Sequence, residues 1–299
     1  MKRKIAQIGP STLMISLPSK WAKKFNLKKG HEIDILENNE KLIVSTQNEI
    51  LQKELEINVS SLDVMLYRLI GAIYKSGYDQ VKIVFNNPKQ LETIYDVLRK
   101  TCLGFEIIEQ FKNLIIIKEI SKPEYHEFEN VLRRNFLFLL SVANDSLDSI
   151  KKQDFEELKN ITLRDHNINK YSDFCRRILN KKPISEKSSP LYHIVEQIEK
   201  IGDIYRDLCL YVSENKLKID REIIEIYTEI NEFLTSFYEI FYKFNFSNIE
   251  EFGKKRNEIY NLINKAFTSK NHDRHILVYL NNVFNTVFDL NGALMTYHL

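Results

Sequence analysis

Hydrophobic and polar positions follow three different patterns along this 299-residue chain. Short apolar runs separated by turn residues occupy residues 1–47, mixed strand-like and helix-like runs occupy 48–120, and long helical periodicity fills 121–299. A chain of this length exceeds the size of one typical core. The three patterns therefore predict three domains.

The first segment has the pattern of four short strands and one short helix. Residues 5–8 and 13–17 predict strands on either side of a Gly-Pro-Ser turn. Pro18 suits the first turn of a helix, where a missing N–H costs nothing. Residues 33–44 predict a hairpin with its turn at Asn38-Asn39. Such a short segment buries little surface alone, so we expect a second copy to complete its core.

Positive charge is concentrated in this same segment. Residues 1–47 hold nine Lys or Arg and four Asp or Glu, a net charge of +5, whereas the whole chain carries +2. The rest of the chain is therefore slightly acidic. A basic excess confined to one small domain points to an anionic partner for that domain.

The run IGPSTLMISLPSKWAKKFNLKKGHEIDILENNEKLIVS resembles the AbrB/MazE/SpoVT family, whose members form intertwined dimers by swapping hairpins. The resemblance implies a homodimer that binds DNA. The basic positions of the family fall on Arg3 and Lys4 and on Lys23 and Lys24. Lysine and arginine neutralise phosphates and release counterions, so we expect salt-sensitive binding.

The first segment departs from this family pattern in one place. Pro10-Ser11 stands where DNA-binding members often carry a basic residue, and most of the bases are lysine rather than arginine. Lysine makes point-charge contacts more readily than bidentate contacts to bases. The alternative is a module that only dimerises and has a solvated basic rim.

The middle segment, residues 48–120, predicts elements in the order β-α-β-α-β-β. This order is typical of a small α+β sandwich with helices on one face. The segment shows no phosphate-binding loop and no cluster of catalytic residue types. We interpret it as a connecting or sensing domain.

Helical periodicity dominates the last segment, in which glycine is rare. Short links between long helices favour antiparallel bundles, and the six helices are expected to form two repeats of three, about 125–214 and 219–299. The predicted helices span approximately 125–151, 153–181, 190–214, 219–245, 247–269 and 272–298.

Acidic residues recur on two neighbouring helices of the first repeat. Their spacing places one row opposite the apolar stripe of the third helix and a similar outward row on the second helix. Like charges one turn apart oppose helix formation, so water, Lys200 and Arg206, or a bound cation must offset them. From charge alone, a solvated face and a metal site both stay open. The rows are Glu196, Glu199, Asp203 and Asp207, and Asp165, Asn169 and Asp173.

The runs VEQIEKIGDIYRDL and LRDHNINKYSDF resemble the acidic motifs of the PhoU family. The resemblance implies two three-helix bundles in tandem, with iron or zinc bound at Asp165, Asn169, Glu199 and Asp203. With the AbrB-like head, the whole chain resembles an archaeal PhoU-like regulator. This implies control of phosphate uptake through a transporter ATPase or a sensor kinase.

The second repeat departs from the PhoU motif. Asn257, Asn261, Asn281 and Asn285 stand where carboxylates are expected. Neutral amides bind metal far more weakly than carboxylates do, because they do not balance cationic charge. We therefore predict at most one metal site, in the first repeat.

Two functional hypotheses stay open. One is a PhoU-like regulator of phosphate homeostasis, and the other is an AbrB-like transcriptional regulator whose helical tail serves only oligomerisation or partner binding. The sequence contains no Gly-rich phosphate loop, nucleophile–base arrangement or HExxH motif, so no enzymatic activity is predicted. Three scattered cysteines and the lack of an apolar run of about 20 residues predict a cytoplasmic protein without membrane insertion.

Overall fold

The computed structural model forms two compact units, Met1–Gln52 and Lys53–Leu299. Each unit is described by itself. None of the helices described is long and apolar enough to cross a membrane. The structure describes residues 2–38, 41–46, 53–121, 125–181, 187–269 and 272–299.

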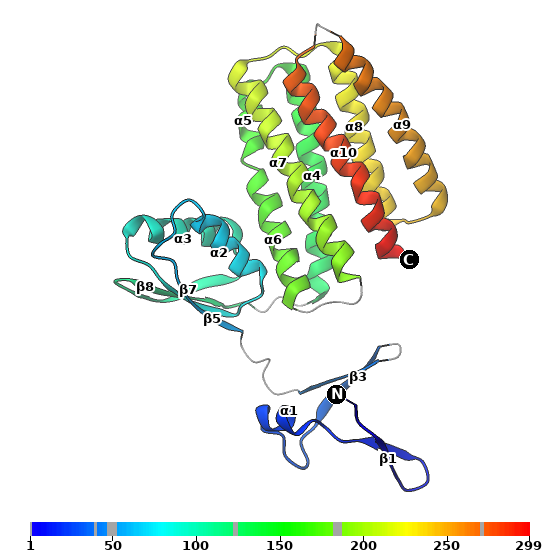
Figure 1. Ribbon diagram of the computed structural model, residues 1–299. Helices are drawn as coiled ribbons and strands as arrows, with labels where there is room; N and C mark the ends of the chain where they lie inside the picture. Colours follow the sequence, from blue (N-terminus) through cyan, green and yellow to red (C-terminus); the bar gives the residue numbers. More distant parts are fainter. Residues whose placement is uncertain (1, 39–40, 47–52, 122–124, 182–186, 270–271) are drawn as a thin grey trace. The chain divides into compact units, whose positions relative to one another are not determined.

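The first unit contains two antiparallel hairpins and one helix (Figure 1). Strand β1 (Ile5–Ile8) pairs with β2 (Thr12–Ile15), and β3 (Ile33–Asn38) pairs with β4 (Lys41–Thr46). Helix α1 (Ser19–Lys24) follows the first hairpin. The strand-rich N-terminal segment predicted from short apolar runs and turn residues is confirmed.

Glycine fits the sharp turns of this unit. Gly9 has φ 72° between β1 and β2, and Gly30 has φ 92° before β3. This left-handed conformation costs glycine little, because glycine has no Cβ atom. The turn predicted at Asn38-Asn39 lies partly outside the described residues, since residue 39 is not among them.

The second unit begins with a four-stranded sheet in the order β5-β6-β8-β7. Strands β5 and β6 are parallel, and the other neighbours are antiparallel. The strands β6 and β8 bury alternate residues against a core shared with two helices. Figure 1 shows both helices on one side of the sheet. The elements are β5 (Glu54–Asn58), α2 (Leu66–Lys75), β6 (Gln80–Val84), α3 (Pro88–Thr101), β7 (Phe105–Phe111) and β8 (Leu114–Glu119).

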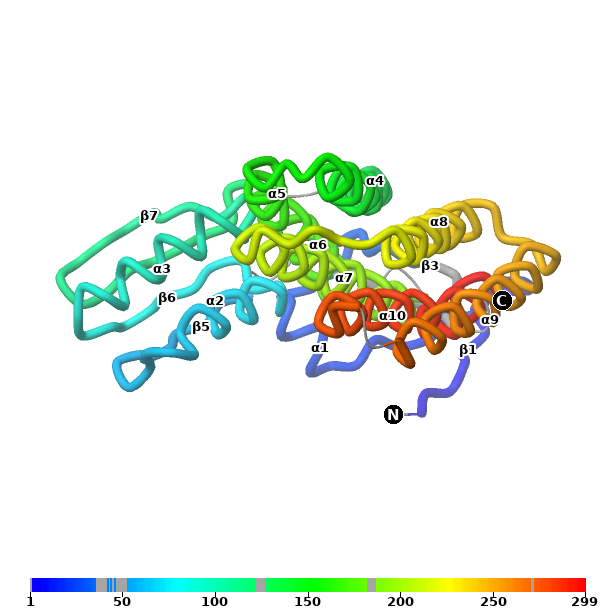
Figure 2. Tube along the Cα trace, turned by 90° about the horizontal axis from the view of Figure 1, so that it is seen from above, coloured from blue at the N-terminus to red at the C-terminus, as the bar shows by residue number. Residues whose placement is uncertain are grey.

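Seven helices follow the sheet among the described residues, where six were predicted. A single hydrophobic core runs through all of them. Helix α7 packs against α4, α5, α6 and α10, and Figure 2 shows it between α6 and α10. The predicted halves therefore share one core. The helices are α4 (Tyr125–Lys152), α5 (Phe155–Thr162), α6 (Asp165–Lys181), α7 (Ser188–Asn215), α8 (Arg221–Tyr242), α9 (Phe246–Thr268) and α10 (Arg274–His298).

The helix predicted at 153–181 is in fact two helices, α5 and α6. The backbone N–H groups of Leu163 and Arg164 bond to carbonyls three residues earlier, which closes α5 with tight turns. The Arg164 guanidinium pairs with Glu157 at 3.0 Å and also contacts Asp145 of α4. Apolar periodicity continues across this turn, so the pattern did not reveal the break. The predicted link at 182–185 lies outside the described residues, and that at 269–271 lies largely outside them.

Buried polar side chains inside the helical core are paired with one another. The Tyr205 hydroxyl donates to Asn231 Oδ1 at 2.7 Å, and Asn231 Nδ2 donates to the carbonyl of Ala143 at 2.7 Å. Ser146 and Tyr227 share a hydrogen bond of 2.7 Å. These bonds join α4, α7 and α8, so the first and second helical halves are fixed in one register.

Helix α6 ties the helices to the sheet through buried polar contacts. The fully buried guanidinium of Arg177 donates to the carbonyl oxygens of Tyr74 and Tyr78 at 2.6 and 2.7 Å, and pairs with Glu119 at 3.0 Å. The next turn adds Lys181, whose ammonium contacts Glu119 and also Asp79. The sheet and the helices are therefore joined by charged groups that are withdrawn from water.

A histidine joins the beginnings of α8 and α10. His272 Nδ1 lies 2.9 Å from a carboxylate oxygen of Asp220, and its Nε2 lies 3.0 Å from one of Glu222. Both ring nitrogens donate to carboxylates only when the imidazole is protonated. The hydrogen bond to Asp220 is the main cause that raises the pKa of His272, and the charge of both carboxylates adds to it.

Folding stability is expected to fall as the pH rises through the folded-state pKa of His272. Because this pKa is raised, the contribution of the imidazolium is fully present below about pH 6.5 and is lost above the folded-state value. The check is the thermal midpoint between pH 6 and pH 9. His272→Gln should remove this part of the decline, and an unchanged pH profile in that variant would contradict the assignment.

Candidate functional site

The basic residues predicted to contact DNA lie on two elements of the first unit. Arg3 and Lys4 precede β1, and their side chains are exposed. Lys23 and Lys24 form the last turn of α1, where the helix dipole favours positive charge. Both lysines are exposed. The two pairs can therefore present charge to a solvent-side partner, but they come from different elements.

Apolar side chains of the first unit lie open to solvent. None of the described side chains in this unit is buried. The first hairpin carries such residues on both faces, because Ile5 pairs with Ile15 and Ala6 pairs with Met14. Large exposed apolar patches on a folded domain are typical of surfaces that bind a partner. The exposed apolar residues of the unit are Ile5, Ile8, Leu13, Met14, Ile15, Ile35 and Leu42.

The second candidate site is the contact between α6 and α7, which contains all four predicted metal ligands. We call it the α6–α7 seam. It consists of two clusters, each built around an arginine. The first contains Arg206 with Asp165, Asp203 and Asp207, and the second contains Arg176 with Asp173, Glu196 and Glu199.

Arg206 joins carboxylates from both helices. Its Nη1 donates to Asp165 Oδ2 on α6 at 2.9 Å and also to Asp203 Oδ1 on its own helix. Its Nη2 donates to Asp207 Oδ1 at 2.8 Å. Burial acts to lower the pKa of Arg206, but hydrogen bonds to Asp207 and Asp165 and the charges of Asp165 and Asp203 raise it overall. Arg206 is therefore a permanent cation in the seam.

Asp165 is buried at the first turn of α6. Burial raises the pKa of its carboxyl group, and the charge of Arg206 opposes that rise. Its Oδ2 also accepts a hydrogen bond of 2.9 Å from Asn169 Nδ2. Gly202 faces it from α7, where a Cβ atom would lie 3.1 Å from Ile168 and 3.6 Å from Asp165 Oδ1. The lack of a side chain at Gly202 thus allows the two helices to approach closely at this carboxylate.

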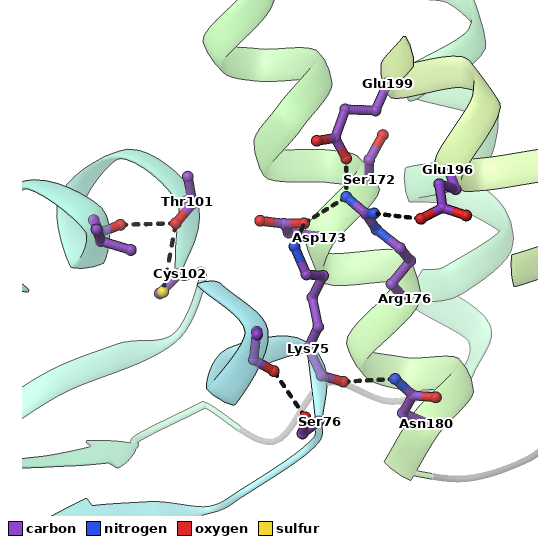
Figure 3. Close-up of polar contacts among 12 residues, drawn as sticks. Lys75, Ser76, Thr101, Cys102, Ser172, Asp173, Arg176, Asn180, Glu196 and Glu199 are labelled. Carbon is purple, nitrogen blue, oxygen red and sulfur yellow. Dashed lines mark hydrogen bonds and ion pairs between the residues drawn. The ribbon is translucent and has the colours of Figure 1, made fainter. Parts of the chain in front are cut away.

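The second cluster lies farther along the same two helices (Figure 3). Arg176 Nη2 lies 2.7 Å from Asp173 Oδ1 and also contacts Glu199 on α7. Its Nη1 lies 3.8 Å from Glu196. Lys75 of α2 reaches Asp173 Oδ1 at 3.2 Å, so the sheet-side helix adds a second cation.

The outward orientation predicted for Asp165 and Asp173 is wrong. Both carboxylates are buried, with exposed fractions of 4% and 5%, because their stripe of α6 faces α7 and α2. Charge made this stripe look like a solvated face, but buried carboxylates are tolerated where they are paired. The row on α7 stays partly open, since Glu196 and Asp207 have exposed fractions of 53% and 46%.

The four predicted ligands do not fit an iron or zinc ion. Asp165 and Asp203 share the guanidinium of Arg206, and Glu199 is paired with Arg176. Asn169 turns its amide nitrogen toward Asp165 and adds no charge. Zinc sites are usually built from His, Cys and carboxylate groups that converge on one point. In the described part of the chain, no group of three such residues does so.

The corresponding asparagines of the second half form no comparable arrangement. Asn257, Asn261 and Asn285 are exposed, and Asn281 is half-buried. Arg256 of α9 instead lies over the rings of Tyr260 and Phe288, at 4.8 and 5.0 Å from their centroids. The polar seam is thus a feature of α6 and α7.

Sequence reasoning missed Arg176 and Lys75 as members of this site. Arg176 follows Asp173 by three residues, a spacing at which helical side chains can pair. That spacing was a usable signal for Arg176. Lys75 belongs to a different helix, so only the folded structure brings it to Asp173.

Comparison with known proteins identifies one similarity. Residues 7–51 match the model of a family described as "Antidote-toxin recognition MazE, bacterial antitoxin". The matched range includes Lys23 and Lys24, whereas Arg3 and Lys4 precede it. No curated protein and no solved structure matches the chain. The predicted AbrB/MazE-like head is thereby supported, and the matched part is a small fraction of the chain.

Proposed function

We propose that this protein is a homodimeric, DNA-binding transcriptional regulator that acts in the cytoplasm. In this proposal, the first unit forms the dimer and contacts DNA, while the helical region serves oligomerisation or partner binding. The observation that carries it is the match of residues 7–51 to the MazE family. The basic charge and the exposed apolar strands of the same residues support it.

The proposed dimer would bury the apolar strands of the first unit. A small unit with no described buried side chain lacks a core of its own. The hairpin β1–β2 has apolar residues on both faces, which suits a strand pair enclosed by a second copy. In a dimer with two-fold symmetry, each copy would bury its own apolar strands against the same strands of the other copy.

DNA binding in this proposal rests on lysine charge. The exposed ammonium groups of Lys23 and Lys24 would neutralise phosphates, with Arg3 and Lys4 adding charge from the N-terminal segment. Contacts of this kind position a protein on DNA and supply affinity without reading much sequence. We therefore expect a strong dependence of binding on salt concentration.

The double variant Lys23→Ala/Lys24→Ala is expected to weaken binding to duplex DNA and to flatten its salt dependence. A dimer would lose four cations, which corresponds to a decrease of up to about 4 in the slope of log K against log salt. Fluorescence anisotropy with a labelled duplex, measured over a series of salt concentrations, provides both quantities.

The matched control is Lys151→Ala/Lys152→Ala. This adjacent pair of exposed lysines also ends a helix, α4, but lies in the second unit. The control should bind DNA as the wild type does. Equal DNA affinity and slope in the α1 variant and the wild type would rule out the proposed role of Lys23 and Lys24.

Regulation of phosphate uptake is a second hypothesis that rests on the motif resemblance of α6 and α7 alone. It would require a partner such as a transporter ATPase or a sensor kinase. The comparisons contain no match to the helical region, so they add nothing to this hypothesis. A phosphate-transport operon next to the gene would support it.

A further inference from the structure

We propose that Arg206 and Arg176 take the place of metal ions in the α6–α7 seam and act as its permanent counter-ions. The two helices would then be held together by side chains of the protein alone, and the contact between them would not depend on the concentration of metal ions. This inference concerns the second unit and does not depend on DNA binding by the first.

In each cluster, one guanidinium nitrogen lies between a carboxylate of α6 and a carboxylate of α7. Arg206 Nη1 donates both to Asp165 Oδ2 of α6, at 2.9 Å, and to Asp203 Oδ1 of α7. A metal ion that joined the helices through Asp165 and Asp203 would compete with Arg206 for these two carboxylates. The guanidinium nitrogen therefore occupies the bridging position between a carboxylate of α6 and a carboxylate of α7.

The second cluster repeats this arrangement. Arg176 Nη2 lies between Asp173 Oδ1 of α6, at 2.7 Å, and Glu199 Oε2 of α7. The Arg176 side chain is 5% exposed, so water does not easily replace it. Two helices are thus joined twice, each time through one guanidinium between a carboxylate of α6 and a carboxylate of α7.

Charge explains why these arginines would exclude a divalent ion. A guanidinium keeps its proton at all physiological pH values, and the carboxylates around Arg206 raise its pKa further. A metal ion entering the cluster would meet this fixed positive charge at short range. To bind Asp165 Oδ2, it would also have to displace two existing donors, Arg206 and Asn169.

Removal of the guanidinium would leave a set of oxygen ligands. Asp165 Oδ1 and Asn169 Oδ1 are buried and have no hydrogen-bond partner among the described residues. Asp165 Oδ2 and Asp203 Oδ1 would lose Arg206 as well. Hard divalent ions such as Mn²⁺ prefer oxygen ligands of this type. The seam should therefore gain an affinity for Mn²⁺ when Arg206 is replaced by a neutral residue.

The test compares the full-length wild type with Arg206→Gln in Mn²⁺ and in Zn²⁺, each added alone. Isothermal titration calorimetry measures binding, and thermal unfolding is recorded with either metal or with EDTA. We expect no binding and no shift of the midpoint in the wild type. Arg206→Gln should bind Mn²⁺ at least about tenfold more tightly than the weakest affinity that the calorimetry can detect, and it should unfold at a higher temperature when Mn²⁺ is present.

Arg221→Gln is the matched control, because Arg221 also pairs with a carboxylate, that of Glu225, but is 92% exposed. It should behave as the wild type does. The proposal is overturned if the wild type binds one equivalent of either metal and Asp165→Asn abolishes that binding. It is also overturned if folded Arg206→Gln gains no affinity. If Arg206→Gln does not fold, elemental analysis of the wild type and of Asp165→Asn replaces the titration. Bound metal in the wild type but not in Asp165→Asn would overturn the proposal. Neither protein containing bound metal would support it.

Discussion

Replacement of Leu13 and Ile15 by aspartate is expected to dissociate the proposed dimer into monomers. Both residues lie on the same face of the hairpin β1–β2, because they are two residues apart on strand β2 and alternate side chains of a strand share a face. Their exposed fractions are 67% and 58%, so nothing within their own unit covers them. In the proposed dimer, the second copy would bury them.

The expected loss of dimer affinity is large. Burial of one such side chain contributes about 1.5–3 kcal/mol, and the double variant removes four of them from a dimer. The lower end, about 6 kcal/mol, corresponds to a dissociation constant raised about 10⁴-fold. Sedimentation equilibrium over a range of protein concentrations measures this constant directly. DNA binding should weaken in parallel, because each monomer carries half of the cations.

The control for added charge is Ser11→Asp. Ser11 lies in the turn between β1 and β2 and is exposed, so the variant adds a carboxylate without removing an apolar side chain. It should stay dimeric. A double variant that also stays dimeric at the same concentrations would show that this face of the hairpin is not the dimer interface.

Apolar spacing predicted most of the secondary structure. Short apolar runs marked β6 and β8, in which the structure buries every second residue, namely Val81, Ile83, Ile115 and Ile117. Steps of three and four residues marked α7 in the same way. These elements follow the pattern because the burial of one face dominates their stability. The spacing of apolar residues within each element determines which face that is.

Electrostatic pairing between helices could not be predicted in the same way. Asp165 and Asp173 are spaced like residues of a solvated face, and only the contacts with Arg206, Arg176 and Lys75 make their burial tolerable. Those partners come from other turns and other helices. A pattern along one helix therefore locates a charged stripe, but the direction in which it points depends on the packing.

Among single substitutions in the second unit, we expect the largest decrease in the free energy of unfolding at the contact between the sheet and α6. Arg177→Met removes a buried guanidinium that donates to two carbonyl oxygens and pairs with Glu119. Removal of one partner from a buried ion pair costs about 3–5 kcal/mol. We expect a loss near the lower end, because Lys181 still contacts Glu119 while the two carbonyl oxygens lose their donor. Arg99→Met, at an exposed position of α3, should change the free energy of unfolding by less than about 0.5 kcal/mol.

Two optical signals report separately on the unfolding of the two units. The single tryptophan of the chain, Trp21, lies in the first unit, so its fluorescence reports on that unit. Far-UV circular dichroism reports mainly on the helices of the second unit. Arg177→Met should lower the urea midpoint of the circular dichroism signal. A variant with an unchanged midpoint would show that this contact contributes little to stability.

The double variant Arg177→Met/Glu119→Gln tests whether the pair itself carries this stability. Glu119→Gln alone leaves Arg177 with its two carbonyl partners and leaves Lys181 paired with Asp79. If the ion pair is coupled, the double variant should be destabilised by less than the sum of the single variants, by about 0.5–3 kcal/mol. Strict additivity would instead assign the effect of Arg177 to the carbonyl oxygens of Tyr74 and Tyr78. The joint would then act as a cap on the backbone of α2 rather than as a salt bridge between sheet and helix.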